Sequence, residues 1–202
     1  MEKLREVTIE PYSAETNIQN PQWLMYEGLL SKEICEKIIE LAKKLPSSQG
    51  TIFANNEINE MRKSQVRWIN SDNSDFYSLF DLIYRIIREV NKGFRVNCNK
   101  FPSLQFTEYL GPGYKYDWHH DVNWSSEEND VRKISIVIQL SDPNTYSGGE
   151  FEFRNYENPD KDRLKSQGTV LCFLPYHEHR VKPIISGSRY SLVGWMDGPR
   201  WV

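Results

Sequence analysis

The second half of the chain consists of short apolar runs, rich in β-branched and aromatic residues and separated by Gly, Pro, Asn and Ser. This feature constrains the fold most, because such runs are typical of strands and such interruptions are typical of turns. Many short strands can bury their apolar faces together in a sandwich or a barrel. The runs are 103–110, 132–140, 150–153, 168–174 and 188–196.

The first half of the chain is predicted to be helical. Apolar residues recur at helical spacing over 31–45, with Ser31 as N-cap and Pro46 as a stop. A second apolar stripe covers 75–91, and Gly93 is expected to close that helix. We expect both stripes to pack on the sheet, which gives an α+β fold.

Composition and length favour one domain over residues 1–202, with 1–100 as helical or mixed support and 101–202 as the β core. The net charge of −3 disfavours a nucleic-acid-binding role. Cys35, Cys98 and Cys172 form no CxxC pair, which favours reduced thiols and a cytoplasmic location. There is no signal-peptide pattern and no apolar run of membrane-spanning length, so no membrane partner is expected.

The stretch YDWHHDVNW, residues 116–124, holds two of the four histidines beside two aspartates. On a strand, side chains alternate between faces, so His119 and Asp121 share one face and His120 points the other way. His119 and Asp121 can therefore hold one metal ion together. His-x-Asp alone is a weak motif, and a third ligand is needed.

The remaining histidines, His177 and His179, lie together after the apolar run 168–174. Either can supply the third ligand, since both have the same parity on an extended segment. Two imidazoles and one carboxylate form the facial triad that suits non-haem Fe(II). A structural zinc site would need four ligands, and the distant cysteines do not supply a fourth.

Arg189 follows ten residues after His179 and shares a predicted strand face with Ser191, Val193 and Trp195. An arginine there can bind the far carboxylate of a dicarboxylate bidentately, through two parallel N–H···O bonds, and Ser191 can add a hydroxyl. The alternative is a surface arginine paired with Asp or Glu.

Together these segments resemble a known family, the Fe(II)/2-oxoglutarate-dependent dioxygenases, and within it the prolyl 4-hydroxylase-like group. EYLGPGYKYDWHHD, YSGGEFEF and HRVKPIISGSRYSLVGW are similar, in this order, to segments of that group. The resemblance covers residues 103–197, about half of the chain. It implies a double-stranded β-helix (jelly-roll) core with the N-terminal helices packed on its major sheet.

The resemblance also implies a role for each matching residue. His119, Asp121 and His179 would bind Fe(II), with His179 favoured over His177 because the segment RVKP follows it. Arg189 would bind the C5 carboxylate of 2-oxoglutarate, Tyr109 would hydrogen-bond this co-substrate, and Ser191 and Trp195 would line its pocket. No catalytic residue beyond the metal ligands is implied. Gln139, Tyr116 and His177 are candidates for the shell around the site, and Gln139 stands where some prolyl hydroxylases have a tyrosine.

The function implied is hydroxylation of a prolyl or related residue in a protein or peptide, with O2 consumed, succinate and CO2 released, and ascorbate as reductant. One alternative is the same chemistry on a nucleic-acid base, as in AlkB-type demethylases, or on a free small molecule. A second alternative is a non-catalytic double-stranded β-helix binding module. The polar segment 51–68 is either a lid over a peptide groove or a plain connection.

Overall fold

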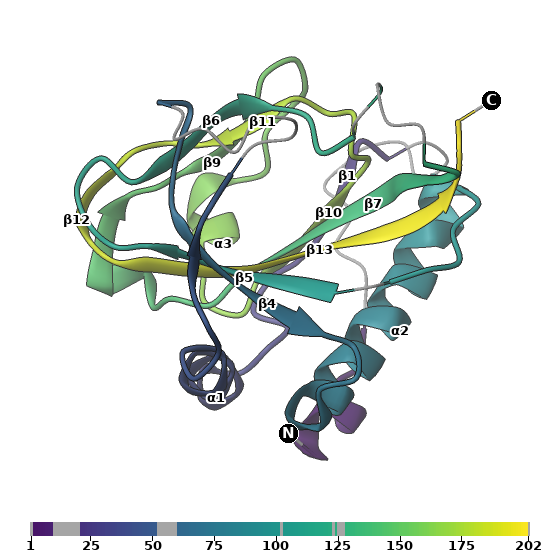
Figure 1. The fold of residues 1–202 in the computed structure, drawn as a ribbon, viewed down its shortest axis with the longest axis horizontal. Coiled ribbons are helices and arrows are strands. Elements are labelled where there is room, and N and C mark those ends of the chain that lie inside the picture. Colours follow the sequence, from purple (N-terminus) through teal and green to yellow (C-terminus); the bar gives the residue numbers. More distant parts are fainter. Residues whose placement is uncertain are drawn as a thin grey trace.

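The computed structural model describes residues 2–9, 21–51, 60–101, 103–122, 124 and 128–201. Within these ranges the chain forms two antiparallel sheets that face each other, with helices on the outer face of the larger one (Figure 1). None of the helices in these ranges has the length and apolar character that a membrane span requires.

The larger sheet has seven strands in the order β1-β10-β7-β13-β5-β4-β2, and each neighbouring pair is antiparallel. All five runs predicted as strands from the sequence contain strands of the structure, four of them in this sheet. Its members are β1 (Trp23–Tyr26), β2 (Ser48–Gln49), β4 (Gln65–Asn70), β5 (Ser103–Tyr109), β7 (Asp130–Gln139), β10 (Val170–Phe173) and β13 (Arg189–Pro199).

The smaller sheet has four strands in the order β3-β6-β11-β9, and a two-stranded ribbon pairs β12 with β8. A second apolar core, which includes Phe151, Phe173 and Val181, fills the space between the two sheets. The strands are β3 (Arg62–Lys63), β6 (Lys115–His119), β8 (Tyr146–Gly148), β9 (Phe151–Phe153), β11 (His179–Val181) and β12 (Ile184–Gly187).

Two helices, α1 (Lys32–Ala42) and α2 (Tyr77–Phe94), cover the larger sheet as predicted. Ser31 is the N-cap of α1, and its side chain accepts a hydrogen bond from the Ile34 amide. The shorter helical elements are η1 (Glu2–Glu6), η2 (Ser74–Phe76), η3 (Pro143–Thr145) and α3 (Lys161–Lys165).

The predicted end of the second helix is wrong, because α2 continues through Gly93 and ends at Phe94. Arg95 adopts the left-handed conformation (φ 54°) expected of a terminating glycine. Gly93 meets a packing requirement instead, since a Cβ there would lie 2.9 Å from Cγ of Pro21. The glycine therefore permits the close approach of the segment that leads into β1.

The first half of the chain is less helical than predicted, because β1, β2, β3 and β4 all lie before residue 71. β1 and β2 form the two edges of the larger sheet, and β4 pairs with β5. Strand pairing over such sequence separations leaves no clear local pattern in segments of two to six residues. This is why the composition of the first half did not reveal them.

Alternation along the central strands separates structural residues from cavity residues. On β7, Ile134, Ile136 and Ile138 pack toward the helices, whereas Val137 lines the space between the sheets. On β13, Leu192 faces the helices. The residues that face the inter-sheet space include Gln105, Thr107 and Tyr109 of β5 and Arg189, Ser191, Val193 and Trp195 of β13.

Candidate active site

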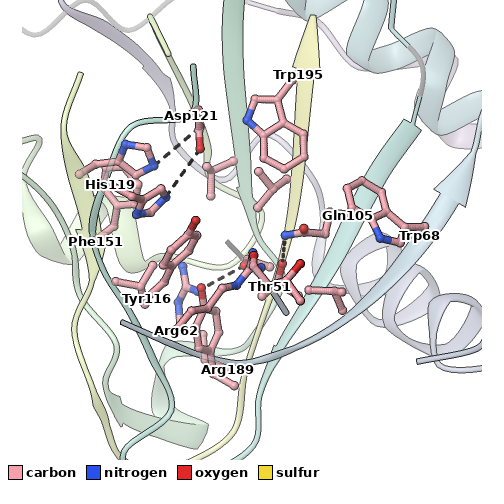
Figure 2. Close-up of a pocket in the computed structure, with 18 of the residues that line it drawn as sticks. Thr51, Arg62, Trp68, Gln105, Tyr116, His119, Asp121, Phe151, Arg189 and Trp195 are labelled. Atoms are coloured by element: carbon pink, nitrogen blue, oxygen red, sulfur yellow. Dashed lines mark hydrogen bonds and ion pairs between the residues drawn. The ribbon is translucent and has the colours of Figure 1, made fainter. Parts of the chain in front are cut away.

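A cavity of about 220 Å³ lies between the two sheets (Figure 2). Its exposed lining residues, which mark its open end, are Ser48, Gln49, Thr51 and Trp68. It gathers side chains from β3, β4, β5, β6, β7, β9, β11 and β13, so residues far apart in the sequence share one space. Its polar lining includes Arg62, Gln105, Thr107, Tyr109, Tyr116, His119, Asp121, Arg132, His179, Arg189 and Ser191.

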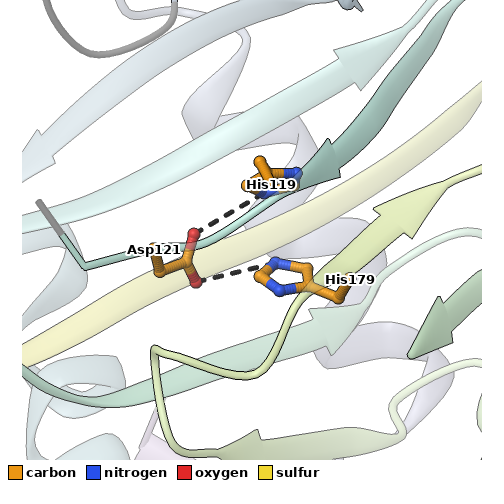
Figure 3. A group of neighbouring side chains, drawn as sticks. All are labelled: His119, Asp121 and His179. Atoms are coloured by element: carbon orange, nitrogen blue, oxygen red, sulfur yellow. Dashed lines mark ion pairs between the residues drawn. The ribbon is translucent and has the colours of Figure 1, made fainter. Parts of the chain in front are cut away.

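Three potential metal ligands converge on one wall of this cavity. His119 ends β6, His179 begins β11, and Asp121 lies in the bend after β6 (Figure 3). One ligand atom from each lies within 4.8 Å of the others. Nε2 of His119 lies 3.6 Å from Oδ1 of Asp121, and Nε2 of His179 lies 3.7 Å from Oδ2.

Backbone carbonyl groups fix both imidazole rings. Nδ1 of His119 lies 2.7 Å from the carbonyl oxygen of Asp117, and Nδ1 of His179 lies 2.8 Å from that of His177. A carbonyl can only accept, so Nδ1 carries the proton and the lone pair of each Nε2 points toward Asp121. The hydroxyl of Ser135 donates to Oδ2 of Asp121 at 2.7 Å and orients the carboxylate.

The site's protonation state suits metal binding. Burial, followed by the neighbouring His179, lowers the pKa of His119 to about 3, so this imidazole is neutral at pH 7. Burial raises the pKa of Asp121, but His179, His119, Arg132 and the Ser135 hydroxyl outweigh it and hold the pKa at about 2. Neutral imidazole and ionised carboxylate are the forms that ligate metals, so no proton must be displaced from these two groups.

Arg189 lies at the inner end of the cavity and is 1% exposed. Its Nη1 donates to Oγ of Ser191 at 3.3 Å, and its Nη2 donates to Oε1 of Gln139 at 2.7 Å. Among the described residues, no carboxylate lies within ion-pair distance of this guanidinium. Gly149 packs behind it, where a Cβ would lie 3.0 Å from Cδ of Arg189. The result is a buried cation held by neutral groups.

The other residues predicted for the co-substrate pocket also line the cavity. Tyr109 is buried beside Arg189, whose Cζ lies 5.3 Å from the centre of the ring. Burial raises the pKa of Tyr109 and Arg189 opposes this effect, so the hydroxyl keeps its proton. Trp195 is 8% exposed, and its indole nitrogen has no hydrogen-bond partner within the described ranges.

The shell candidates occupy three different positions. The Tyr116 ring stacks on the His119 ring, with centroids 3.4 Å apart and planes 9° from parallel. Gln139 contacts Arg189 as described above. His177 does not line the cavity, because its ring stacks on Tyr156, and only its carbonyl oxygen supports His179.

Four other residues of the stretch 116–124 are not among the residues that line the cavity. His120 is exposed, and its Nδ1 lies 2.9 Å from the carbonyl oxygen of Tyr176. The Asp117 carboxylate pairs with Lys115 at 3.4 Å. The Trp118 ring contacts the guanidinium groups of Arg154 and Arg180, and Trp124 is 58% exposed. The alternation argument needs one amendment, since β6 ends at His119 and Asp121 reaches the site through a bend.

Several cavity residues were not predicted as site residues from the sequence. Arg62 and Trp68 lie in the segment 51–68, interpreted as a lid or a loop; residues 62–63 and 65–70 are strands, whereas 52–59 lie outside the described residues. Arg132 donates from Nη1 to the Asp121 carbonyl at 3.1 Å. Alternation could have linked Val66 and Trp68 of β4, but no local pattern marks Arg62, because β3 belongs to the other sheet and pairs with β6.

Comparison with known proteins identifies the family. The model of the 2OG-Fe(II) oxygenase superfamily matches residues 104–197, the segment that contains the three ligands and Arg189. Residues 104–197 of this chain belong to the 2OG-Fe(II) oxygenase superfamily.

A PKHD-type hydroxylase of Synechococcus elongatus is 32% identical over 102 residues, 50% of this chain and 44% of that protein. One of Idiomarina loihiensis is 34% identical over 104 residues, 51% and 42% of the two chains. The matched part thus spans less than half the length of these oxygenases.

Solved prolyl hydroxylases share the fold of this chain. A viral collagen prolyl hydroxylase from Paramecium bursaria Chlorella virus-1, in its 2-oxoglutarate complex, superposes with a TM-score of 0.67 and 21% identity over 88% of this chain and 96% of that one. A Trichoplax adhaerens prolyl hydroxylase, in complex with a hypoxia inducible factor peptide, gives 0.69 and 21% over 87% and 83%. The predicted family and double-stranded β-helix fold are therefore confirmed.

Proposed function

We propose that the protein is an Fe(II)- and 2-oxoglutarate-dependent dioxygenase that hydroxylates a prolyl or related residue in a protein or peptide. One observation carries the proposal. A three-ligand cluster and a buried arginine without a carboxylate partner, among the described residues, line the same cavity. The first fits a divalent metal and the second fits the distant carboxylate of a dicarboxylate co-substrate.

The metal would be held by His119, Asp121 and His179. Three ligands on one side of an ion leave positions for other ligands, as in non-haem Fe(II) oxygenases and unlike closed structural zinc sites. Bound Fe(II) would supply the O2 chemistry that couples decarboxylation of 2-oxoglutarate to hydroxylation of a C–H bond, giving succinate and CO2. Ascorbate would serve as the reductant that keeps the iron ferrous.

Arg189 would bind the C5 carboxylate of 2-oxoglutarate. Ser191 and Gln139 hold its guanidinium in place with neutral contacts that leave the charge uncompensated. The hydroxyl of Tyr109 lies on the same side and would donate a hydrogen bond to the co-substrate. The indole N–H of Trp195 would donate another, since it has no partner among the described residues.

Aromatic rings packed on the two imidazoles would hold the proposed metal ligands in place. The Tyr116 ring covers His119, and Phe151 stacks on His179 with centroids 5.2 Å apart and planes 24° from parallel. These rings exclude water from one side of the ligands and restrict rotation of the imidazoles. The substrate and O2 would enter from the open end of the cavity, where Trp68 and Gln49 are exposed.

A cytoplasmic location belongs to the same proposal. All three cysteines are free thiols, and Cys35 and Cys172 are buried. Burial raises the pKa of Cys35 to about 12, so this thiol stays protonated and unreactive. Free thiols of this kind are typical of reducing compartments.

The test combines purified protein, Fe(II), ascorbate and 2-oxoglutarate with proline-containing peptides. The expected result is succinate release together with a peptide mass gain of one oxygen atom. Parallel reactions with a methylated oligonucleotide and with free amino acids separate the alternative substrates. Absence of succinate in every reaction, together with no 2-oxoglutarate-dependent thermal shift, would refute the enzyme assignment and favour a binding module.

A further inference from the structure

The cavity carries more positive charge than the proposed metal and co-substrate account for. Among the described residues that line it, three are arginines (Arg62, Arg132 and Arg189) and one is a carboxylate, Asp121. Arg132 interacts electrostatically with Asp121 and Asp197, so the excess positive charge lies at Arg62 and Arg189. A divalent cation and a doubly charged co-substrate cancel each other, so binding both leaves this excess unchanged. The lining therefore favours a substrate that carries a carboxylate.

Arg62 has the geometry of an anion-binding group. It lies on β3 and is 7% exposed. Its Nε donates to Oγ of Ser64 at 2.8 Å, and its Nη1 donates to the carbonyl oxygen of Thr51 at 2.9 Å. Nη2 takes part in no hydrogen bond with the residues that the structure describes. One side of the guanidinium is thus available to the cavity.

Two partly buried arginines of the sheets, Arg67 and Arg180, differ from Arg62 in having a carboxylate partner. Nε of Arg67 lies 2.7 Å from Glu108, and Nη2 of Arg180 lies 2.9 Å from Glu152. Arg62 forms no ion pair within the described ranges. A buried charge without a counter-ion is costly, and hydrogen bonds to a hydroxyl and a carbonyl offset only part of that cost.

We propose that Arg62 binds a carboxylate of the substrate, so the preferred substrate carries a carboxylate close to its oxidised C–H group. This inference rests on the proposed function, which supplies the metal and co-substrate at the other positions of the cavity. The carboxylate has two possible sources, an acidic residue beside the hydroxylated residue of a peptide and the carboxylate of a free amino acid.

The contacts of Arg62 place the anion near the metal ligands. Cζ of Arg62 lies 4.4 Å from the centre of the Tyr116 ring, and that ring stacks on His119. One aromatic ring therefore separates the guanidinium from the first proposed ligand (Figure 2). A carboxylate bound to Arg62 would hold the neighbouring atoms of the substrate beside the metal.

Arg62 and Arg189 belong to opposite walls. Arg62 pairs in register with Tyr116 of the smaller sheet, whereas Arg189 pairs with Tyr109 of the larger sheet. Arg189 is held by Gln139 and Ser191, and Arg62 is held by Ser64 and Thr51. No supporting side chain is shared, so substitution of one arginine should leave the position of the other intact.

The experiment measures binding without turnover. Protein loaded with Mn(II) and 2-oxoglutarate is titrated calorimetrically with end-blocked Ala-Pro-Glu and Glu-Pro-Ala, their glutamine counterparts, L-proline and L-prolinamide. A charge-assisted pair predicts roughly tenfold to hundredfold tighter binding of an acid than of its amide. In Arg62→Gln the acid and its amide should bind equally. Preference within the peptide pairs or within the proline pair identifies the source of the carboxylate.

Two variants distinguish the loss of carboxylate binding at Arg62 from a general effect of removing one positive charge. Lys63→Gln removes the same charge from the neighbouring, exposed position of β3, outside the cavity, and should keep the preference for the acid. Arg62→Lys keeps the charge without the planar guanidinium and should keep part of the preference. A 2-oxoglutarate-dependent thermal shift in Arg62→Gln shows that the variant is folded and binds the co-substrate.

Three results would count against the inference in different ways. Equal binding of acids and amides by the unsubstituted protein would overturn it, and so would an unchanged preference in Arg62→Gln. Loss of 2-oxoglutarate binding in Arg62→Gln as large as in Arg189→Gln would assign Arg62 to the co-substrate and also overturn it. Absence of a 2-oxoglutarate shift in the unsubstituted protein would refute the proposed function instead.

Discussion

The two ends of the cavity differ in how their polar groups are held. At the inner end, Asp121, His179 and Arg189 are each at most 5% exposed, and each has neighbours that fix its orientation. At the open end, Gln49 is exposed and Trp68 is 45% exposed. The contrast indicates that the inner end determines the reaction, whereas the open end is the place where the substrate would be selected.

The largest effect is expected from removing a proposed ligand at the inner end. His179→Ala should abolish iron-dependent succinate formation and reduce iron affinity by more than the roughly 10- to 100-fold typical of losing a residue that only supports a ligand. Equilibrium dialysis and a succinate assay measure the two quantities. His177→Ala is the matched control and should keep much of the activity. The opposite pattern would transfer the ligand role to His177.

The next effect concerns Arg189, also at the inner end. Arg189→Gln should raise the 2-oxoglutarate concentration needed for half-maximal turnover roughly tenfold to hundredfold, because one or more charge-assisted hydrogen bonds are lost. Iron binding, measured by dialysis, should remain. Equal loss of iron binding and of 2-oxoglutarate affinity would mean that the guanidinium stabilises the fold rather than binding the co-substrate.

A pH effect of intermediate size should appear in the metal-free protein. The pKa of His119 falls from 6.5 to about 3 on folding, chiefly through burial. Between these two pH values the unfolded state binds more protons than the folded state. The contribution of His119 to the free energy of unfolding is therefore fully present above pH 6.5 and is lost as the pH falls toward 3. Thermal melting in chelator from pH 7.5 to 5 measures the slope. His119→Gln should flatten it, and an unchanged slope would exclude His119 as its source.

The smallest effect is expected at the open end. Trp68 lies with its ring centre 6.3 Å from that of Trp195, and much of its surface remains exposed. Trp68→Ala should weaken peptide binding by roughly two- to tenfold, as expected for one aromatic contact, with little change in 2-oxoglutarate binding. Calorimetry measures both. Tyr77→Ala removes an aromatic ring that is 55% exposed outside the cavity and should change neither.

Much of the fold followed from local patterns. The apolar stripe of α2 and the alternation along β5, β7 and β13 are encoded within single segments, so they could be predicted directly. The edge strands could not, because β1 and β2 depend on pairing with β10 and β4. A short strand becomes recognisable only when its partner is known.

The residues of the candidate site also divide into those that the sequence predicted and those that required the structure. His119, Asp121, His179 and Arg189 lie within the segments that resemble the family, and the structure brings all four to one cavity. Arg62 reaches that cavity through the pairing of β3 with β6, across more than 50 residues of sequence. No pattern around Arg62 encodes that pairing, so its place beside Tyr116 required the structure.

Gly149 has a consequence for the position of Arg189. A Cβ at this position would lie 3.0 Å from Cδ of Arg189 and 2.5 Å from Cδ1 of Ile184, so a larger residue would have to displace one of these side chains. Gly149 also has a φ of 69°, which strains the backbone of any residue with a side chain. The glycine therefore leaves the room in which the guanidinium of Arg189 keeps its place, and tolerance for a dicarboxylate of a given length depends on a residue that never touches it.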